Sequence, residues 1–257
     1  MSKKKKIFNQ KIQQQLKDRS ESAWCNYARL VIGRPRLGAL LYYEIITGIF
    51  GNLPGMLGYW LRRRLYPTIL KSCGKNLIIG RNVTIRGGMK IRLGSDVSID
   101  DNVVIDARGK NGCIVIERGT LISRNTILRA RNATIIIGKG SDIGTNCILA
   151  TDSKLKVGKN VLIAAYSYLC AGGNHTYDRS DIPIIQQGFI SKGGVIIEDD
   201  VWIGSHTMIM DGVCICKGSI IGTHSLVNID IPEGSIAYGK PAVRQSWRPG
   251  FGDESND

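Results

Sequence analysis

The stretch IEDDVWIGSHTMIMDGVCICKGSIIGTHSLV (Ile197–Val227) decides the fold, because a large aliphatic residue returns in it at every sixth position. Neither an α-helix nor an ordinary β-strand has that period. The same ladder runs backwards through the chain in triplets such as Val157, Ile163 and Leu169, and it begins at Ile79. Most anchors are followed four positions later by a small or β-branched residue, with Gly, Asp, Asn or Lys between. Such a unit predicts a short flat strand and a tight corner, and successive units close triangular coils of an all-β solenoid.

The spacing between the triplets stretches, and every extra residue leaves from the same corner of the coil. The stretched intervals run from Ile105 to Ile116, Leu128 to Ile137, Leu149 to Val157 and Leu169 to Ile197. Solenoids often build their binding surface from insertions on one face. The longest insertion, residues 170–196, is therefore predicted to be a protruding arm that carries chemistry.

The net charge of +14 is concentrated in the first part of the chain. Residues 1–75 hold fifteen Lys and Arg against three Asp and Glu, or +12, which leaves +2 for the remainder. Such a basic segment suits nucleic acid, an anionic membrane or simple solubility. The apolar, aromatic stretch LGALLYYEIITGIFGNLPGMLGYWLRRRLYPTIL (residues 37–70) follows it and favours a membrane surface over nucleic acid.

Residues 37–70 do not form a good transmembrane helix, which needs about twenty uninterrupted apolar residues. Glu44 and Pro54 interrupt the stretch, Arg34 and Arg36 precede it, and Arg62 to Arg64 follow its apolar part. Basic flanks at both ends indicate the cytoplasmic side. We therefore expect a broken helical hairpin on the cytoplasmic leaflet; the alternative is a helical cap over the open end of the solenoid. The basic N-terminus lacks a following apolar core, so no signal peptide is expected and a cytoplasmic, peripheral location is predicted.

Cysteines and histidines do not form a metal-binding pattern. The seven cysteines have no zinc-like spacing and indicate a reducing compartment, with Cys147 at an inward position of the ladder. His206 and His224 stand 18 residues apart at the same slot of successive coils, so they are expected to stack outside the solenoid. With His175 on the arm they make a poor ligand set, and no metal is predicted.

The hexapeptide ladder, the NHTYD segment of the arm, DDVWIGSHTMI and the closing IPEGSIAYGKPAVR resemble the left-handed β-helix acyltransferases, in particular O-acetyltransferases of sugars and surface polysaccharides. The resemblance covers about Leu77 to Arg244. It implies a left-handed parallel β-helix, acetyl-CoA as acyl donor, and a homotrimer whose active sites lie between neighbouring prisms. The expected domains are a helical membrane-associating region (1–75), the β-helix (76–245) and a C-terminal tail (246–257).

The resemblance implies that His175 is the general base. A sugar hydroxyl does not ionise at neutral pH, and an imidazole can take its proton during attack. Asn174 is expected to bind a sugar hydroxyl or the oxyanion. Asp178 or Asp181 would bind the acceptor or orient the imidazole, and a backbone carbonyl could orient it equally well.

The cofactor site is expected on the last regular coils. Trp202 is predicted to flank the thioester or acceptor, or else to be buried between subunits. By resemblance, the small residues Gly204, Ser205, Gly222 and Thr223 would line the pantetheine arm. The family's Thr-Lys pair is replaced by Asn228-Ile229. Lys240, Arg244 or Arg248 would then have to bind the phosphate groups of acetyl-CoA.

The function that these features favour is transfer of acetyl from acetyl-CoA to a sugar hydroxyl of a bacterial surface glycan or its lipid-linked precursor. An alternative within the same class is an N-acyltransferase acting on an amino sugar nucleotide. An alternative outside it is a non-catalytic β-helix scaffold that binds a membrane or a partner. No nucleic-acid partner is expected.

Overall fold

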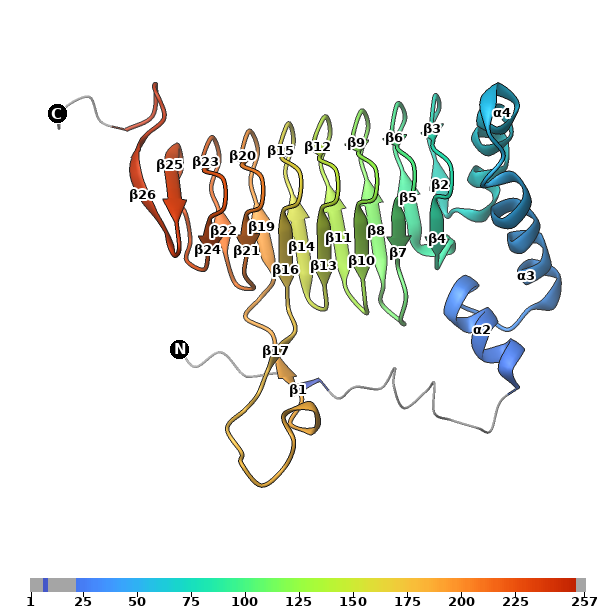
Figure 1. Cartoon of the computed structure of the whole chain (residues 1–257), viewed down its shortest axis with the longest axis horizontal. Helices are drawn as coiled ribbons and strands as arrows, with labels where there is room; N and C mark the ends of the chain where they lie inside the picture. Colours follow the sequence, from blue (N-terminus) through green and yellow to red (C-terminus); the bar gives the residue numbers. More distant parts are fainter. Residues whose placement is uncertain (1–6, 9–21, 253–257) are drawn as a thin grey trace.

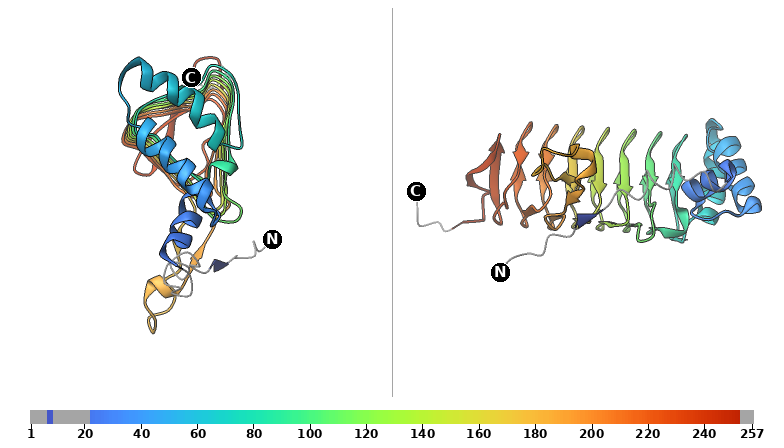
Figure 2. Two further views of the ribbon diagram at one scale, coloured as in Figure 1. Left: turned by 90° about the vertical axis from the view of Figure 1, so that its right-hand side faces the viewer. Right: turned by 90° about the horizontal axis from the view of Figure 1, so that it is seen from below.

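The computed structural model describes residues 7–8 and 22–252, and its main body is a parallel β-solenoid of triangular cross-section (Figures 1 and 2). Each coil contributes one strand to each of three faces, which we number in the order in which the chain meets them. The prediction of a solenoid of three-sided coils is confirmed.

Face 1 consists of β2 (Ser72–Cys73), β5 (Ile91–Leu93), β8 (Cys113–Ile116), β11 (Thr134–Ile137), β14 (Lys154–Val157), β19 (Val195–Ile197) and β22 (Cys214–Ile215). Face 2 consists of β3 (Ile78–Ile79), β6 (Ser98–Ile99), β9 (Leu121–Ile122), β12 (Asp142–Ile143), β15 (Leu162–Ile163), β20 (Trp202–Ile203), β23 (Ile220–Ile221), β25 (Ser235–Gly239) and the antiparallel β26 (Ala242–Trp247). Face 3 consists of β4 (Thr84–Arg86), β7 (Val104–Asp106), β10 (Ile127–Ala130), β13 (Ile148–Thr151), β16 (Tyr168–Ala171), β21 (Met208–Ile209) and β24 (Leu226–Val227).

The hexapeptide anchors form the core because they stack in register from coil to coil. On face 1, Ile137 pairs with Ile116 on one side and Val157 on the other, and all three side chains are fully buried. Burial of each such side chain contributes about 1.5–3 kcal/mol. The small residue four positions later lies at the corner, where its hydroxyl can satisfy a carbonyl: Ser141 Oγ donates to the carbonyl oxygen of Gly158 (2.8 Å).

The corners use residues that tolerate the left-handed backbone region. At the corner between faces 2 and 3, the first four coils carry asparagines with φ between +55° and +61°, namely Asn82, Asn102, Asn125 and Asn146. Asparagine is among the few side chains that visit this region readily. The corner chemistry expected from the Gly, Asp and Asn between anchors is thus observed.

The helices lie at the first coil and close that end of the prism, as the end-on view in Figure 2 shows. They are α2 (Ala23–Ile32), α3 (Leu37–Glu44), the π-helix η1 (Ile45–Phe50), α4 (Gly55–Leu65) and the 3-10 helix η2 (Tyr66–Ile69). A further 3-10 turn, η3 (Gly88–Lys90), joins the first coil to the second.

The cap satisfies backbone carbonyls of the first coil, which has no preceding coil to pair with. Tyr43 donates to the carbonyl of Ile85 (2.7 Å), Tyr66 to that of Val83 (3.0 Å), and Arg62 Nε to that of Ile79 (2.9 Å). Burial raises the pKa of both phenols to about 12, so they remain donors at neutral pH. An unpaired sheet edge invites association, and the cap covers this one.

The inner face of the helices therefore forms the cap that we named as the alternative to a membrane hairpin. Within the described residues, the helices are too short or too polar for any of them to cross a membrane. Membrane association of this region remains a prediction, and the part that falls on residues 1–6 and 9–21 lies outside the described residues.

Candidate active site

The arm leaves the corner between faces 3 and 1, after β16 and before β19, as Figure 1 shows. The shorter insertions leave the same corner in the preceding coils, between β7 and β8, β10 and β11, and β13 and β14, as predicted. Within the arm, β17 (Asn174–His175) pairs antiparallel with β18 (Phe189–Ile190), and η4 (Ile184–Gln186) lies between them. β1 (Ile7–Phe8) adds a third strand on the other side of β18.

Asp211 fixes the root of the arm. Its carboxylate is buried, and it accepts hydrogen bonds from the backbone N–H of Lys192 (2.6 Å), the backbone N–H of Gly194 (2.8 Å) and Nδ2 of Asn174 (2.9 Å). Bonds to a charged acceptor are about twice as strong as neutral ones. Since Asn174 precedes His175, this carboxylate positions the backbone that carries the imidazole.

His175 lies on this anchored strand with its side chain exposed, and the Phe189 ring meets the imidazole edge-on at 6.2 Å between centroids. Asp178 is also exposed. Asp181 forms an ion pair with Arg179, and the hydrogen bond from Arg179 lowers the pKa of its carboxyl. Of the two aspartates considered as partners of the imidazole, Asp181 is therefore engaged elsewhere.

Gln187 holds the loop of the arm closed. Its amide Nε2 donates to the carbonyls of Arg179 (2.6 Å) and Ile182 (3.0 Å), and its Oε1 accepts from the backbone N–H of Arg179 (3.1 Å). Thr176 Oγ1 donates to the carbonyl of Gln187 (2.6 Å). The arm is thus an ordered hairpin-like unit with its own hydrogen bonds.

Arginines gather where face 3 meets the arm-bearing corner. Arg129 stands between Asp106 and Ala150 in the strand register, and Arg108 forms an ion pair with the buried Asp106 (2.6 Å). Burial, and then neighbouring Arg129, lowers the pKa of Arg131. Arg131 belongs to the coil two steps before the arm, or ~10 Å along the axis at ~4.8 Å per coil. This corner on the cap side of the arm therefore holds three arginines beside the carboxyl groups of Asp106 and Asp152.

The residues predicted to bind the cofactor lie on face 2 and at the corner between faces 2 and 3. Trp202 points outward from β20 and is 49% exposed. A Cβ on Gly204 would lie 2.7 Å from the Thr223 nitrogen, and one on Gly222 would lie 2.7 Å from Tyr238 Cβ. Close stacking of the coils therefore accounts for both glycines without a ligand, and their cofactor role stays a prediction, as it does for Ser205.

The basic residues of the C-terminal hairpin differ in their availability. Lys240 is exposed, and the Arg244 guanidinium stacks 4.0 Å above the Trp247 ring. Arg248 donates to Asp200 (2.8 Å) and to the carbonyl of Gly218 (3.2 Å), so it ties the hairpin to the prism. Lys240 and Arg244 are the better placed of the three for a phosphate group.

His206 and His224 stack outside the prism as predicted, with ring centroids 4.6 Å apart, and Tyr166 continues the stack at 4.8 Å from His206. All three occupy left-handed corner positions where the earlier coils carry asparagine. A separate group of possible metal ligands, Glu198, Cys214 and Cys216, lies on face 1. Burial raises the pKa of the Cys214 thiol to about 11, so without a bound ion it stays protonated at neutral pH.

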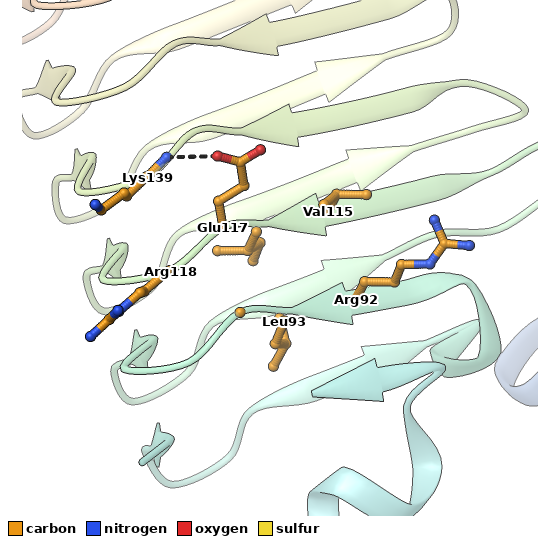
Figure 3. A pocket seen from close by; sticks show the side chains of 8 residues that line it. Arg92, Leu93, Val115, Glu117, Arg118 and Lys139 are labelled. Carbon is orange, nitrogen blue, oxygen red and sulfur yellow. Dashed lines mark hydrogen bonds between the residues drawn. The ribbon is translucent and has the colours of Figure 1, made fainter. Parts of the chain in front are cut away.

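An open depression of about 400 Å³ lies elsewhere, at the corner between faces 1 and 2 (Figure 3). It is lined by Arg92, Leu93, Val115, Glu117, Arg118 and Lys139 and their neighbours. Glu117 accepts the backbone N–H of Lys139, and Arg118 pairs with Asp96, so its polar groups serve the solenoid corners. It contains no imidazole or thiol and does not include the arm.

A single chain does not bring the two halves of the expected site together. His175, Asn174 and Asp178 are on the arm at the corner between faces 3 and 1, whereas Gly204 and Gly222 lie at the corner between faces 2 and 3. A face 3 strand of about four residues, or ~13 Å, separates these corners, and the arm projects farther away. Sequence reasoning missed Gln187, which lies inside the insertion, and Asp211, which follows β21 at the same corner one coil later. The repeat pattern does not distinguish Asp211 from an ordinary polar corner residue.

Comparison with known proteins gives three results. A model of the family described as bacterial transferase hexapeptide (six repeats) matches residues 194–228. A protein of Staphylococcus aureus (strain MRSA252) named as an acetyltransferase is 32% identical over 172 residues, which cover 57% of this chain and 82% of that protein. A galactoside O-acetyltransferase of Lactococcus lactis is 33% identical over 110 residues, covering 41% of this chain and 49% of that protein.

Among solved structures, the polySia-specific acetyltransferase NeuO superimposes with a TM-score of 0.56 at 23% identity, over 71% of this chain and 85% of that chain, which indicates a shared fold. The matched part spans between a third and a half of the length of the first curated relatives, at 48%, 34% and 49%. The repeat, the arm and the extent of the Staphylococcus aureus match together show that the chain belongs to the hexapeptide-repeat acyltransferase family.

Proposed function

We propose that the protein is an O-acetyltransferase that transfers acetyl from acetyl-CoA to a sugar hydroxyl of a bacterial surface glycan or its lipid-linked precursor, with His175 as the general base. The observation that carries this proposal is the placement of His175 on an arm whose root a buried carboxylate fixes. The similarity to a galactoside O-acetyltransferase supports a hydroxyl acceptor.

In this reaction His175 acts at the acceptor hydroxyl. An imidazole nitrogen takes the hydroxyl proton while the hydroxyl oxygen attacks the thioester carbonyl that acetyl-CoA supplies. The C–O ester bond forms, the C–S bond breaks, and the proton passes from the imidazolium to the departing thiolate. Asn174 donates one amide hydrogen to Asp211 and retains a second one for the acceptor or the developing oxyanion.

The site is completed by a neighbouring prism in a homotrimer. The arm exposes apolar side chains beside its charged ones in one chain, with Tyr177 77% exposed and Ile184 and Ile185 more than half exposed. Face 2 carries a separate outward row in which the exposed apolar side chains of Ile78, Leu121, Leu162 and Trp202 are interrupted by Ser98 and Asp142. Contact between two different surfaces is heterologous, and it closes into a ring when the rotation allows. A left-handed coil, as the family resemblance implies, fits this arrangement.

The arm of one subunit would thus carry His175 toward the last coils of the next, where Trp202, Gly204, Ser205, Gly222 and Thr223 line the donor groove. Lys240 and Arg244 lie beside these coils and suit the negative charge of an adenosine diphosphate. The arginines near the root of the arm suit an acceptor that carries an acid or phosphate group.

The test is release of free thiol from acetyl-CoA in the presence of neutral and acidic sugars, sugar nucleotides and lipid-linked glycans. His175→Ala and the nearly isosteric His175→Gln should each abolish transfer, while the oligomer and acetyl-CoA binding stay intact. Turnover by either variant at the wild-type rate would overturn the role of His175. Release only with amino acceptors would establish the N-acyltransferase alternative, and failure to bind acetyl-CoA in calorimetry would favour the scaffold.

A further inference from the structure

The outward face of the helical cap is the largest concentration of exposed apolar side chains in the described residues. Of the twenty-four exposed large hydrophobic residues, ten lie within the 37 residues between positions 24 and 60. These ten, which we call the end patch, are Trp24, Tyr27, Leu37, Leu41, Tyr42, Ile45, Ile49, Met56, Leu57 and Trp60. Large apolar patches on a soluble face mark interaction sites.

The end patch exists because the cap helices are apolar on both sides. In α3, Leu40 and Tyr43 are buried, and Tyr43 joins the core cluster of the prism, while Leu37 and Leu41 are exposed. The π-helix η1 continues this division, with Ile46 buried and Ile49 61% exposed. Closing the solenoid requires only the inner side, so the fold leaves the outer apolar side unexplained.

Positive charge surrounds the end patch. Residues 22–71 hold seven Arg and Lys and one acidic residue, Glu44, whose carboxylate accepts a hydrogen bond from Tyr27 (2.6 Å). Arg62 is buried and serves the first coil, whereas Arg34, Arg36 and Arg64 are exposed. Arg63 is also exposed, and its guanidinium donates to Oδ1 of Asn76 on the prism (3.1 Å). Arg64 lies 5.3 Å from the centre of the Trp60 ring. Apolar and aromatic side chains bordered by arginine match the interface of an anionic bilayer.

We propose that the end patch docks on the anionic surface of a lipid bilayer, inserting Ile49, Met56 and Leu57 among the acyl chains of the facing leaflet while the arginines contact phosphate groups. A second copy of this chain is a poorer occupant, because face-to-face contact would bring the same exposed arginines together. The cap helices lie in the interface and do not cross it.

Docking through the end patch makes the prism stand end-on to the membrane, because the cap closes the first coil (Figures 1 and 2). The arm leaves the fifth coil, four steps beyond the first, or ~19 Å along the axis at ~4.8 Å per step. If the proposed function holds, the acetylated hydroxyl therefore lies well above the lipid headgroups. A glycan several sugars removed from its lipid suits this height better than the first sugar.

The first experiment is flotation with vesicles of phosphatidylcholine and phosphatidylglycerol. The full chain should float with anionic vesicles, and the triple variant Ile49→Ser, Met56→Ser, Leu57→Ser should lower the bound fraction about tenfold or more. Ile229→Ser is the matched control, since Ile229 is 51% exposed but follows β24 at the opposite end of the prism. It should float like the wild type.

The second experiment uses the four native tryptophans as depth probes. Trp24 and Trp60 belong to the end patch, whereas Trp202 and Trp247 have similar exposure near the other end of the prism. Brominated phosphatidylglycerol vesicles should quench the Trp202→Phe, Trp247→Phe protein but not the Trp24→Phe, Trp60→Phe protein. The reverse pattern would overturn end-on docking.

Neither experiment depends on catalysis, so failure of docking and failure of the transferase are separable. Flotation of the triple variant at the wild-type level, or no flotation of the wild type, would overturn the proposal. A wild-type oligomer that the triple variant halves in mass, with no vesicle binding by either, would identify a second copy as the occupant and would equally overturn it. The triple variant should retain thiol release with a soluble acceptor.

Discussion

Replacement of Asp211 by alanine should uncouple the arm from the prism and leave the prism folded. The change removes the acceptor of three hydrogen bonds, of which the one from Gly194 is fully buried and those from Lys192 and Asn174 are partly so. A buried donor left without an acceptor costs ~1–3 kcal/mol. With the buried donor at ~1–3 kcal/mol and each of the two partly buried donors at ~1 kcal/mol, the root of the arm loses about 3–5 kcal/mol.

This loss should be visible directly at the arm. Each ~1.4 kcal/mol changes an equilibrium tenfold, so hydrogen exchange at the amides of Lys192 and Gly194 should accelerate at least about a hundredfold. Since displacement of a catalytic group by ~1 Å can cost ~10²-fold, turnover should fall about a hundredfold, with acetyl-CoA binding unchanged. Turnover and exchange of the Asp211→Asn variant should lie between those of the wild type and of Asp211→Ala, because the asparagine NH₂ group must face at least one of the N–H donors.

Asp230→Ala is the matched control. Asp230 follows β24 at the same corner one coil later, and it accepts a single backbone hydrogen bond, from Cys214 (2.7 Å), without contacting the arm. This variant should keep wild-type turnover. A double variant of Asp211→Ala with His175→Ala should turn over no more slowly than His175→Ala alone, since Asp211 affects turnover only by positioning the imidazole of His175. Wild-type turnover of Asp211→Ala together with accelerated exchange would refute the positioning role.

Three further changes test the fold around the site. Ile163→Ala removes a fully buried anchor of face 2 and should lower the free energy of unfolding by about 2–5 kcal/mol in urea titration; a change near zero would mean that the ladder is not the core. Gly194→Ala places a Cβ 2.0 Å from the Lys154 carbonyl oxygen at a φ of +96°, so it should accelerate exchange in the arm, and unchanged exchange would contradict the strained exit. Burial raises the pKa of Asp152 in spite of Arg131 and Arg129, so its contribution to stability is most favourable below the ordinary aspartate value of 3.8 and is lost as pH rises through the raised pKa. Asp152→Asn should therefore raise the melting temperature at pH 7 and have little effect near pH 3. A lower melting temperature at pH 7 would show that attraction to Arg131 and Arg129 outweighs the cost of burying the charged carboxylate.

The coils were predictable because their determinants are local and repeated. The anchor Ile163 and the small residue that follows four positions later report the same environment in every coil, so period alone identifies strand, corner and core. The common corner of the insertions followed from the same counting. The sequence left the cap as one of two alternatives. Tyr43 and Leu41 both belong to the same apolar and aromatic stretch, and composition does not say that Tyr43 is buried while Leu41 is exposed.

The site was predictable only where the family resemblance reached it. His175 stood out through the NHTYD segment, but its support comes from Asp211, which is 36 positions away and joined to the arm by the coil spacing. The engagement of Asp181 by Arg179 depends on the local path of the arm, which no period encodes.

The repeat forms the core of the chain, and separate contacts hold the features on its outside. The repeat alone buries its anchors on the inside and leaves the outer faces free to vary, so each outer feature must be fixed by its own contacts. Asp211 fixes the arm, Tyr43 and Tyr66 fix the cap, and Arg248 fixes the C-terminal hairpin. Because these contacts lie in different coils, a change in one should alter catalysis, docking or hairpin order separately. Loss of membrane binding in a cap variant with full turnover on a soluble acceptor would be the direct sign of that independence.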